Sequence, residues 1–282
     1  MSQKPRIERA SFADGVGWLS AGGDLMARGG APLFRVATVL LLFSLLQLIP
    51  IIGLPMLLIL SPALTAGMLQ VFHEIDRGRE FGPASMLSGL TDVDARRRLV
   101  SIGVVFIVGM FIATVVFVGW ISDHIDLEAL NRLMSDPQAL NQDPTQLFAL
   151  FEDISGFGTA AIVLGIVGLV LAATYFAVPL VFFWRWPVLA ALVFSLRAVL
   201  VNWIAFLGFG LVVFGVLLLL SLMISMFGGI LQLALGSIGT FLLQFLIILL
   251  SLFFQLLLAA AQWRAFLRVF PVGAEPEGPV ER

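Results

Sequence analysis

Residues 33–74 read LFRVATVLLLFSLLQLIPIIGLPMLLILSPALTAGMLQVFHE, and no ionisable side chain lies between the arginine and the histidine of this stretch. The run is about twice the roughly 20 apolar residues that cross a bilayer once. The segment PIIGLP at 50–55 is typical of a tight turn. The stretch therefore predicts a helical hairpin, with one span at about 33–49 and a second at about 54–72. A single kinked span or a re-entrant loop is the alternative.

The composition of the whole chain is that of a membrane protein. Hydrophobic residues make up 60% of the 282 residues and charged residues only 12%, and the mean hydropathy is +1.05. Soluble domains are about a quarter charged. A net charge of −2 gives no reason to expect nucleic acid binding, and the absence of cysteine excludes disulfides and thiolate chemistry. The arginine-rich, lysine-poor usage indicates a GC-rich bacterial genome.

Further apolar runs predict four more spans, at about 100–122, 157–183, 204–226 and 238–263. The last two come from 66 consecutive uncharged residues, with a turn expected at Gly228-Gly229. The predicted fold class is all-α: a polytopic membrane protein with six transmembrane helices in three hairpins, together with short interfacial helices. The six spans form one domain at 33–270.

Three segments lie outside the predicted spans. In the N-terminal segment 1–32, Phe12, Val16, Leu19 and Trp18 fall near helical spacing, which favours an interfacial helix with its tryptophan at headgroup level. The glycines between Gly15 and Gly30 favour a flexible basic tail instead. The loop 123–156 carries seven acidic residues, and its leucines predict two short amphipathic helices. The tail 271–282 is expected to be disordered.

The basic residues predict the orientation of the chain. The N-terminal segment together with Arg35 at the edge of the first span, 74–99, 185–197 and the C-terminus hold all but one of the 16 Lys and Arg residues. The remaining one, Arg132, lies in the acidic loop. The positive-inside rule then places both termini in the cytoplasm and the acidic loop outside it. A single crossing by residues 33–73 would destroy this segregation, which favours the hairpin.

A weak threefold repeat accompanies the hairpins. A short segment of interfacial character precedes each one, at Gly17–Gly30, Pro83–Arg98 and Pro187–Trp203. Within the second helices, Ser61-Pro62-Ala63-Leu64 matches Ala177-Val178-Pro179-Leu180 loosely. Internal repeats are common in membrane folds, although any six-span protein with amphipathic connectors would show some self-similarity.

Several motifs resemble a family of uncharacterised bacterial inner-membrane proteins, which is more distantly similar to the membrane domain of some glycerophosphodiester phosphodiesterases. The motifs are Gly17-Trp18, Pro32-Leu33-Phe34, Pro50-Ile51-Ile52-Gly53, Ser61 to Met68, Asp76 to Glu80, Tyr175 to Val181, Phe194 to Arg197, Asn202-Trp203, Phe206-Leu207 and Trp263 to Phe266. They cover most of the chain, from about 15 to 270. The resemblance implies the fold and the inner-membrane location. It implies no catalytic activity, because the membrane domain is the part that lacks the phosphodiesterase.

The polar residues within the spans suggest one candidate groove. Apart from Arg35 at the edge of the first span, no predicted span contains an ionisable residue, which argues against an ion-coupled transporter. Gln244, Gln255 and Gln262 are spaced by 11 and 7 residues and therefore share one helical face. They could line a groove for a lipid, or they could form hydrogen bonds between helices, as such residues commonly do.

Two charged clusters are candidate interaction sites. The first comprises His73, Glu74, Asp76, Arg77, Arg79 and Glu80, and the second comprises Arg96, Arg97 and Arg98. The spacing of His73 and Asp76 suits a metal, but further ligands are lacking, so no metal site is predicted. Solvated ion pairs at a helix end are the simpler interpretation. The three arginines could hold anionic lipid headgroups.

These observations predict a non-enzymatic inner-membrane protein that acts in envelope or membrane homeostasis by binding lipids or other membrane proteins. No motif for nucleotide, metal or hydrolase chemistry occurs, so neither catalytic residues nor a cofactor is expected. The alternative is a transporter or flippase for a hydrophobic or lipid substrate. An enzyme that acts on lipid through Glu74, Asp76 and Glu80 is a third hypothesis. The sequence leaves the oligomeric state open.

Overall fold

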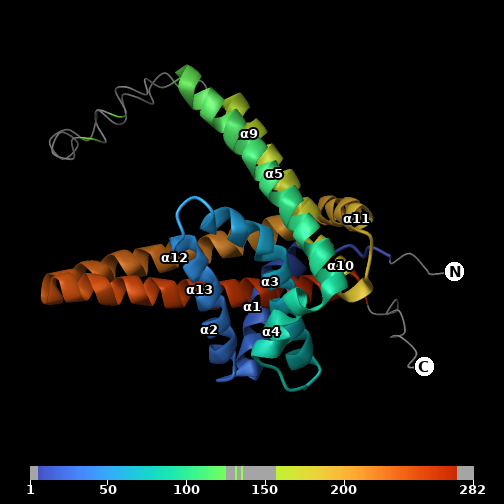
Figure 1. Ribbon diagram of the computed structural model, residues 1–282, viewed down its shortest axis with the longest axis horizontal. Helices are drawn as coiled ribbons and strands as arrows, with labels where there is room; N and C mark the ends of the chain where they lie inside the picture. Colours follow the sequence, from blue (N-terminus) through green and yellow to red (C-terminus); the bar gives the residue numbers. More distant parts are fainter. Residues whose placement is uncertain (1–5, 125–130, 132–134, 136–156, 272–282) are drawn as a thin grey trace. The chain divides into compact units, whose positions relative to one another are not determined.

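The computed structural model describes residues 6–124, 131, 135 and 157–271, and within this part of the chain every regular element is helical. The elements are α1 Phe12–Gly29, α2 Leu33–Ser44, η1 Leu45–Leu48, α3 Gly53–Asp76, α4 Pro83–Thr91, α5 Val93–His124, α9 Phe157–Tyr175, α10 Ala177–Trp184, α11 Val188–Val201, α12 Trp203–Leu235 and α13 Ser237–Val269 (Figure 1). The predicted all-α class is confirmed. The helices predicted within the loop 123–156, and the tail 271–282, lie almost wholly outside the described residues.

The chain forms two compact units. The first comprises residues 1–104 and 172–282, and the second comprises residues 105–171. In the second unit, α5 and α9 approach each other at Gly109, where an added Cβ would lie 2.4 Å from a methyl group of Val170. A small residue therefore permits this helix contact, as is common between membrane helices.

Five helices are long and apolar enough to cross a membrane: α3, α5, α9 continued by α10, α12 and α13. This pattern is that of a multi-pass membrane protein. The first predicted span is the exception, because α2 with η1 is short. The segment formed by α2 and η1 is long and apolar enough to cross a membrane only together with α1. The chain bends by 110° between α1 and this segment. The count is thus five among the described residues, or six if the bent pair forms one span.

The predicted turn in PIIGLP is present. The Gly53 N–H donates to the Ile49 carbonyl at 3.0 Å, and α3 starts at Gly53. An added Cβ at Gly53 would lie 1.8 Å from the Leu46 carbonyl oxygen, so this close approach requires glycine. Ile51 has a φ of 68°, an uncommon conformation for a β-branched residue. The residue is 95% exposed.

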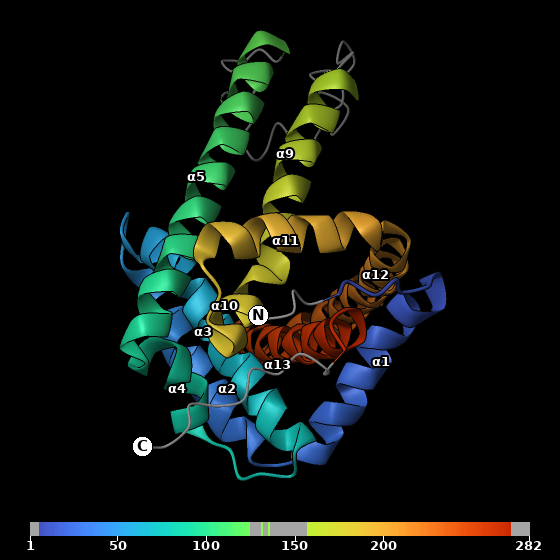
Figure 2. The ribbon, with the colours of Figure 1, turned by 90° about the vertical axis from the view of Figure 1, so that its right-hand side faces the viewer.

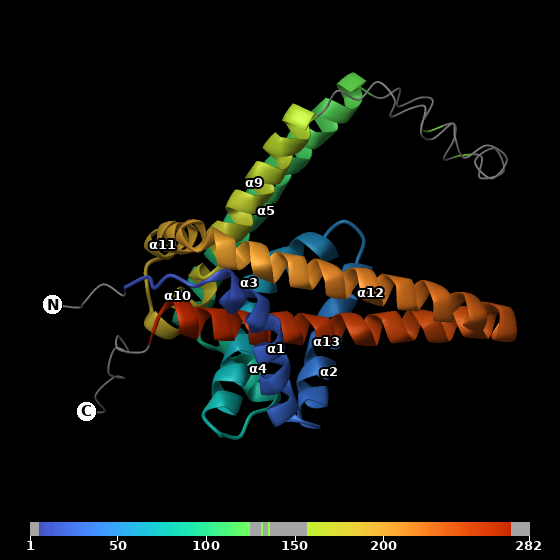
Figure 3. The ribbon, with the colours of Figure 1, turned by 180° about the vertical axis from the view of Figure 1, so that it is seen from behind.

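One predicted span is interrupted, and one predicted turn is wrong. The fourth span, predicted at about 157–183, is present at Ala160–Trp184, but α9 ends at Tyr175 and α10 begins at Ala177 within it. The last turn lies at Gly236, which has a φ of 56°, and not at Gly228-Gly229. Gly228 instead packs against Leu243 of α13, where an added Cβ would lie 2.7 Å from a methyl group. Gly228 thus permits a helix contact, and α12 and α13 run side by side up to the later turn (Figure 3).

Helix α1 packs against α12 and α13 through glycines spaced seven residues apart (Figure 2). An added Cβ at Gly15 would lie 1.8 Å from the Ala205 carbonyl oxygen of α12, and one at Gly22 would lie 2.7 Å from the Ala261 nitrogen of α13. Seven residues return to the same helical face. The glycines that argued for a flexible tail are therefore the contact surface of a helix, and the flexible-tail alternative is wrong.

The predicted apolar face of this helix needs a correction. Trp18 is only 4% exposed and packs edge-on against Phe206, with ring centroids 5.3 Å apart, so it does not face lipid headgroups. Phe12 and Val16, which were predicted to belong to the same face, are exposed, whereas Leu19 is buried as expected. The buried face combines the glycines with Trp18, Leu19 and Leu25.

The N-terminal chain is held by Asn202, at the junction of α11 and α12. The Ala10 N–H donates to Asn202 Oδ1 at 2.6 Å, and Asn202 Nδ2 donates to the Glu8 carbonyl at 3.2 Å. The Glu8 N–H donates to the Val269 carbonyl at the end of α13 at 2.9 Å. The two ends of the described chain therefore lie side by side.

Replacement of Gly15 by alanine tests the packing of α1. We expect Gly15→Ala to lower stability by about 1–3 kcal/mol, because the new methyl group overlaps a backbone carbonyl that cannot easily shift. The matched control is Gly17→Ala, where an added Cβ meets no atom within 4 Å. This control should be neutral or stabilising by about 0.5–1 kcal/mol. Thermal unfolding in detergent measures both, and equal midpoints would contradict the packing.

Candidate functional site

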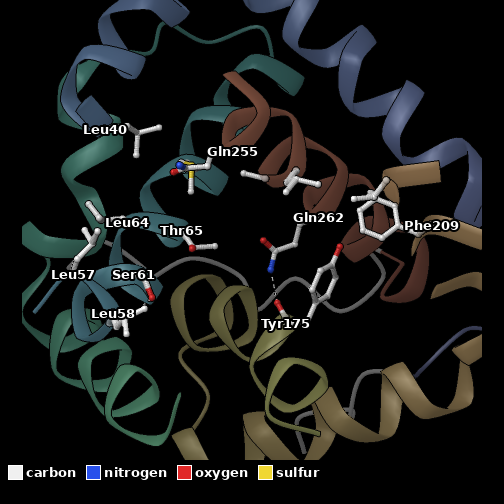
Figure 4. A pocket seen from close by; sticks show the side chains of 14 residues that line it. Leu40, Leu57, Leu58, Ser61, Leu64, Thr65, Tyr175, Phe209, Gln255 and Gln262 are labelled. Carbon is white, nitrogen blue, oxygen red and sulfur yellow. Dashed lines mark hydrogen bonds between the residues drawn. The ribbon is translucent and has the colours of Figure 1, made fainter. Parts of the chain in front are cut away.

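An apolar cavity of about 500 Å³ lies within the first unit (Figure 4). Its wall is contributed by α2, α3, the end of α9, α12 and α13. Nine of its lining residues are apolar and the others carry uncharged polar groups. The lining residues are Leu40, Leu57, Leu58, Ser61, Leu64, Thr65, Met68, Tyr175, Phe209, Val213, Gln255, Leu258, Ala259 and Gln262. We call this feature the apolar cavity.

A proline interrupts the backbone bonding of α3 in the wall of the cavity. Pro62 has no N–H, so the Leu58 carbonyl lacks its usual donor four residues later. The Ser61 hydroxyl donates to this carbonyl at 2.8 Å. Ser61 and Leu58 both line the cavity, so the interrupted turn of the helix faces it.

A second proline breaks the helix that continues from α9 into α10. Pro179 leaves the Tyr175 carbonyl without a helical donor, and the side-chain Nε2 of Gln262 donates to it from α13 (Figure 4). Nearby, the Phe176 N–H donates to Ser195 Oγ at 2.9 Å, and this hydroxyl donates to the Ala172 carbonyl at 2.8 Å. A side chain inserted into the i→i−4 ladder is a known cause of a helix break.

The cavity also has polar groups with spare hydrogen-bonding capacity. The hydroxyl oxygen of Tyr175 is buried and has no hydrogen-bond partner among the described residues. Gln255 also lines the cavity, with its amide group between the leucines of α2 and α3 (Figure 4). A buried polar group without a partner is costly. A ligand in the cavity could therefore accept or donate a hydrogen bond here.

The structure separates the three predicted glutamines. Gln255 and Gln262 line the cavity, whereas Gln244 lies outside it and is exposed. Gln262 lines the cavity and also donates a hydrogen bond to another helix, at the Tyr175 carbonyl.

The first predicted charged cluster divides into three parts. His73, Asp76 and Arg77 line a small pocket at the end of α3. Glu74 does not line this pocket, and its Oε1 accepts from Gln70 Nε2 at 2.8 Å. The remaining two, Arg79 and Glu80, border a separate open hollow together with Pro32, Arg35, Gly78 and Phe81.

Two residues of the predicted arginine run have hydrogen-bond partners within the protein. Arg96 donates to the Leu90 carbonyl at 3.3 Å and Arg98 donates to the Arg185 carbonyl at 2.6 Å, while Arg97 is exposed. Arg96 thus binds a carbonyl in the last turn of α4, and Arg98 binds the carbonyl of the residue that follows α10.

Arg185 forms an ion pair with Asp92, in the connector between α4 and α5. The hydrogen bond from the Arg185 guanidinium, followed by that from the Ala95 N–H, lowers the pKa of Asp92 to about 2. This pair links the connector to the end of α10.

The sequence did not identify the residues that bond to the backbone at the break between α9 and α10, or those that form the ion pairs. Ser195 and Asn202 were noted only as parts of motifs, and Arg28 and Arg264 were counted only as topology signals. The partner of the carbonyl that Pro179 frees lies on another helix, so no local pattern could identify it. The paired prolines, Pro62 and Pro179, were the one available signal.

The comparisons with known proteins add no relative: no family model, curated protein or solved structure matches this chain. Among the described residues, no group of three or more His, Asp or Glu side chains could hold a metal ion.

Replacement of Gln262 tests the closure of the helix break. Gln262→Met keeps the size of the side chain but removes the donor to the Tyr175 carbonyl. We expect a loss of about 1–3 kcal/mol in stability, the usual cost of an unpaired buried polar group. Gln244→Met, the same change on the same helix outside the cavity, should have little effect. Thermal unfolding of both purified variants measures this, and equal losses would refute the role of the bond.

Proposed function

We propose that this protein is a non-enzymatic, multi-pass protein of the bacterial inner membrane that binds a membrane lipid in the apolar cavity and serves envelope or membrane homeostasis. The cavity itself supports this proposal most directly. Its volume of about 500 Å³ is within the range of small-molecule sites, roughly 300–1,000 Å³. The resemblance to bacterial inner-membrane proteins agrees with the proposed location.

The chemistry of the cavity favours a lipid over a water-soluble ligand. Among the described residues, no charged side chain lines it, and leucine is the most frequent lining residue. The helices that enclose it also carry apolar residues on their outer surfaces, including Leu54 of α3 and Leu207 and Leu211 of α12. A ligand dissolved in the bilayer can therefore reach this part of the protein without crossing a polar layer.

A transporter or flippase for a hydrophobic or lipid substrate is the second candidate. The supporting observation is that two proline-interrupted helices, at Pro62 and Pro179, meet at the cavity. Interrupted helices commonly form the substrate sites of transporters. Faster transbilayer movement of a fluorescent phospholipid in vesicles that contain the protein would favour this function over static binding.

A variant that fills the cavity tests the lipid proposal. Ala259 lines the cavity and is 3% exposed, so Ala259→Phe should occupy ligand space. We expect the purified variant to carry much less lipid than the unmodified protein, as measured by native mass spectrometry and quantification of extracted lipid.

The control places the same aromatic group on the outer surface. Leu218→Phe, on the exposed side of α12, should keep the full amount of lipid. Equal lipid content in the two variants, at equal thermal stability, would contradict binding in the cavity.

We propose further that both termini are cytoplasmic. The charge asymmetry of the sequence supports this, and so do contacts among residues assigned to the cytoplasmic side. Arg268 bonds Asp14 and Glu8, and Arg28 and Arg264 both bond Asp76. These residues come from three regions of the sequence, all of which the charge argument assigns to the same side of the membrane.

Single cysteines test the orientation, since the chain has no native cysteine. Arg79→Cys should resist a membrane-impermeant thiol reagent in intact spheroplasts and react after lysis. Asp143→Cys, in the acidic loop, should react in intact spheroplasts. The reverse labelling pattern would overturn the charge argument.

A further inference from the structure

A second, smaller pocket of about 170 Å³ lies where α3, α10 and α13 end. Three of its residues, His73, Asp76 and Arg77, come from the last turn of α3 and its C-cap. The rest of its wall is aromatic or aliphatic and consists of Phe183, Trp184, Trp263, Phe266, Leu267 and Phe270. We call this feature the aromatic pocket.

The carboxylate of Asp76 is already occupied by protein groups. Its Oδ1 lies 3.1 Å from the guanidinium nitrogens of both Arg28 and Arg264, and its Oδ2 accepts from Trp263 Nε1 at 3.4 Å. These three bonds, two of them charge-assisted, occupy most of the roughly four acceptor sites of a carboxylate. Asp76 is therefore a poor partner for a cationic ligand.

Among the described residues, arginines outnumber carboxylates around the aromatic pocket. Arg77 lines it, and Arg28 and Arg264 bind Asp76, the one carboxylate among the described residues that line it. The Nε–H of Arg264 is buried without an acceptor among the described residues, so this guanidinium is only partly satisfied. Glu74, the next acid along α3, is turned toward Gln70. The local field therefore favours an anion.

The wall of the pocket indicates what kind of anion fits. His73 stands 5.1 Å from Trp263 and 5.4 Å from Phe183, measured between ring centroids, so a polar ring is set among apolar ones. Tryptophans and arginines at the ends of membrane helices lie at the depth of lipid headgroups. An anion with an apolar attachment suits such a site better than a fully hydrated ion.

We propose that the aromatic pocket binds the phosphate group of an anionic phospholipid headgroup, with Arg77 and His73 as the groups that contact it. This site is separate from the apolar cavity, and its occupation does not require a lipid there. The chemistry that is recognised is a phosphate with net negative charge.

The experiment measures binding of phosphatidylglycerol and of phosphatidylcholine to delipidated protein in non-ionic detergent by native mass spectrometry. We expect a preference for phosphatidylglycerol, and a reduction of this preference of about fivefold in Arg77→Gln, the usual effect of one basic residue near an anionic surface. Leu267→Trp narrows the pocket without a change of charge and should reduce the preference as well. This second variant keeps the test valid if Arg77→Gln fails to fold.

Arg97→Gln is the control, because Arg97 is an exposed arginine that lines none of the cavities described above. It should keep the preference. Equal losses in Arg77→Gln and Arg97→Gln, or no preference in the unmodified protein, would overturn the proposal. Inorganic phosphate provides a soluble arm: saturable binding that Arg77→Gln abolishes, without a preference among lipids, would assign the pocket to a soluble phosphate and overturn the headgroup assignment. Ala259→Phe should lower total lipid and keep the preference, which separates this pocket from the apolar cavity.

Discussion

Backbone polar groups inside a membrane must find partners within the protein, and this constraint explains the position of the few polar side chains in this chain. Pro62 and Pro179 each leave one carbonyl without its helical donor. Ser61 and Gln262 supply the missing donors, one from the same helix and one from a distant part of the chain. Ser195 similarly joins an amide and a carbonyl that face each other across the break. Ser61 and Gln262 thus form hydrogen bonds with the backbone groups that the prolines leave unpaired in the wall of the apolar cavity.

Close helix approach is the second requirement, and glycine provides it. Helix α1 enters the space beside α12 and α13 because Gly15 and Gly22 bring its backbone almost into contact with theirs. Trp18, between these glycines, then fills the gap left against Phe206. A helix that composition alone would place at the membrane surface becomes part of the packed core.

The two candidate sites use successive parts of the same two helices. The apolar cavity takes residues of α3 up to Met68 and of α13 up to Gln262. The aromatic pocket begins on these helices at His73 and Trp263. An uncharged, leucine-rich site and a cationic, aromatic site therefore occur in the order in which a lipid presents its chains and its headgroup. This order is the physical basis on which lipid recognition is proposed for both.

The sequence by itself determined the helical class, the membrane character and the turn at 50–55, because hydrophobic run length and proline-glycine turns are local properties. It could not determine which glycines end helices, since Gly228 packs against a neighbouring helix while Gly236 makes the turn. It also could not pair Gln262 with Tyr175, or Arg28 and Arg264 with Asp76. Those choices depend on contacts between segments far apart in the chain, and only the tertiary structure decides them.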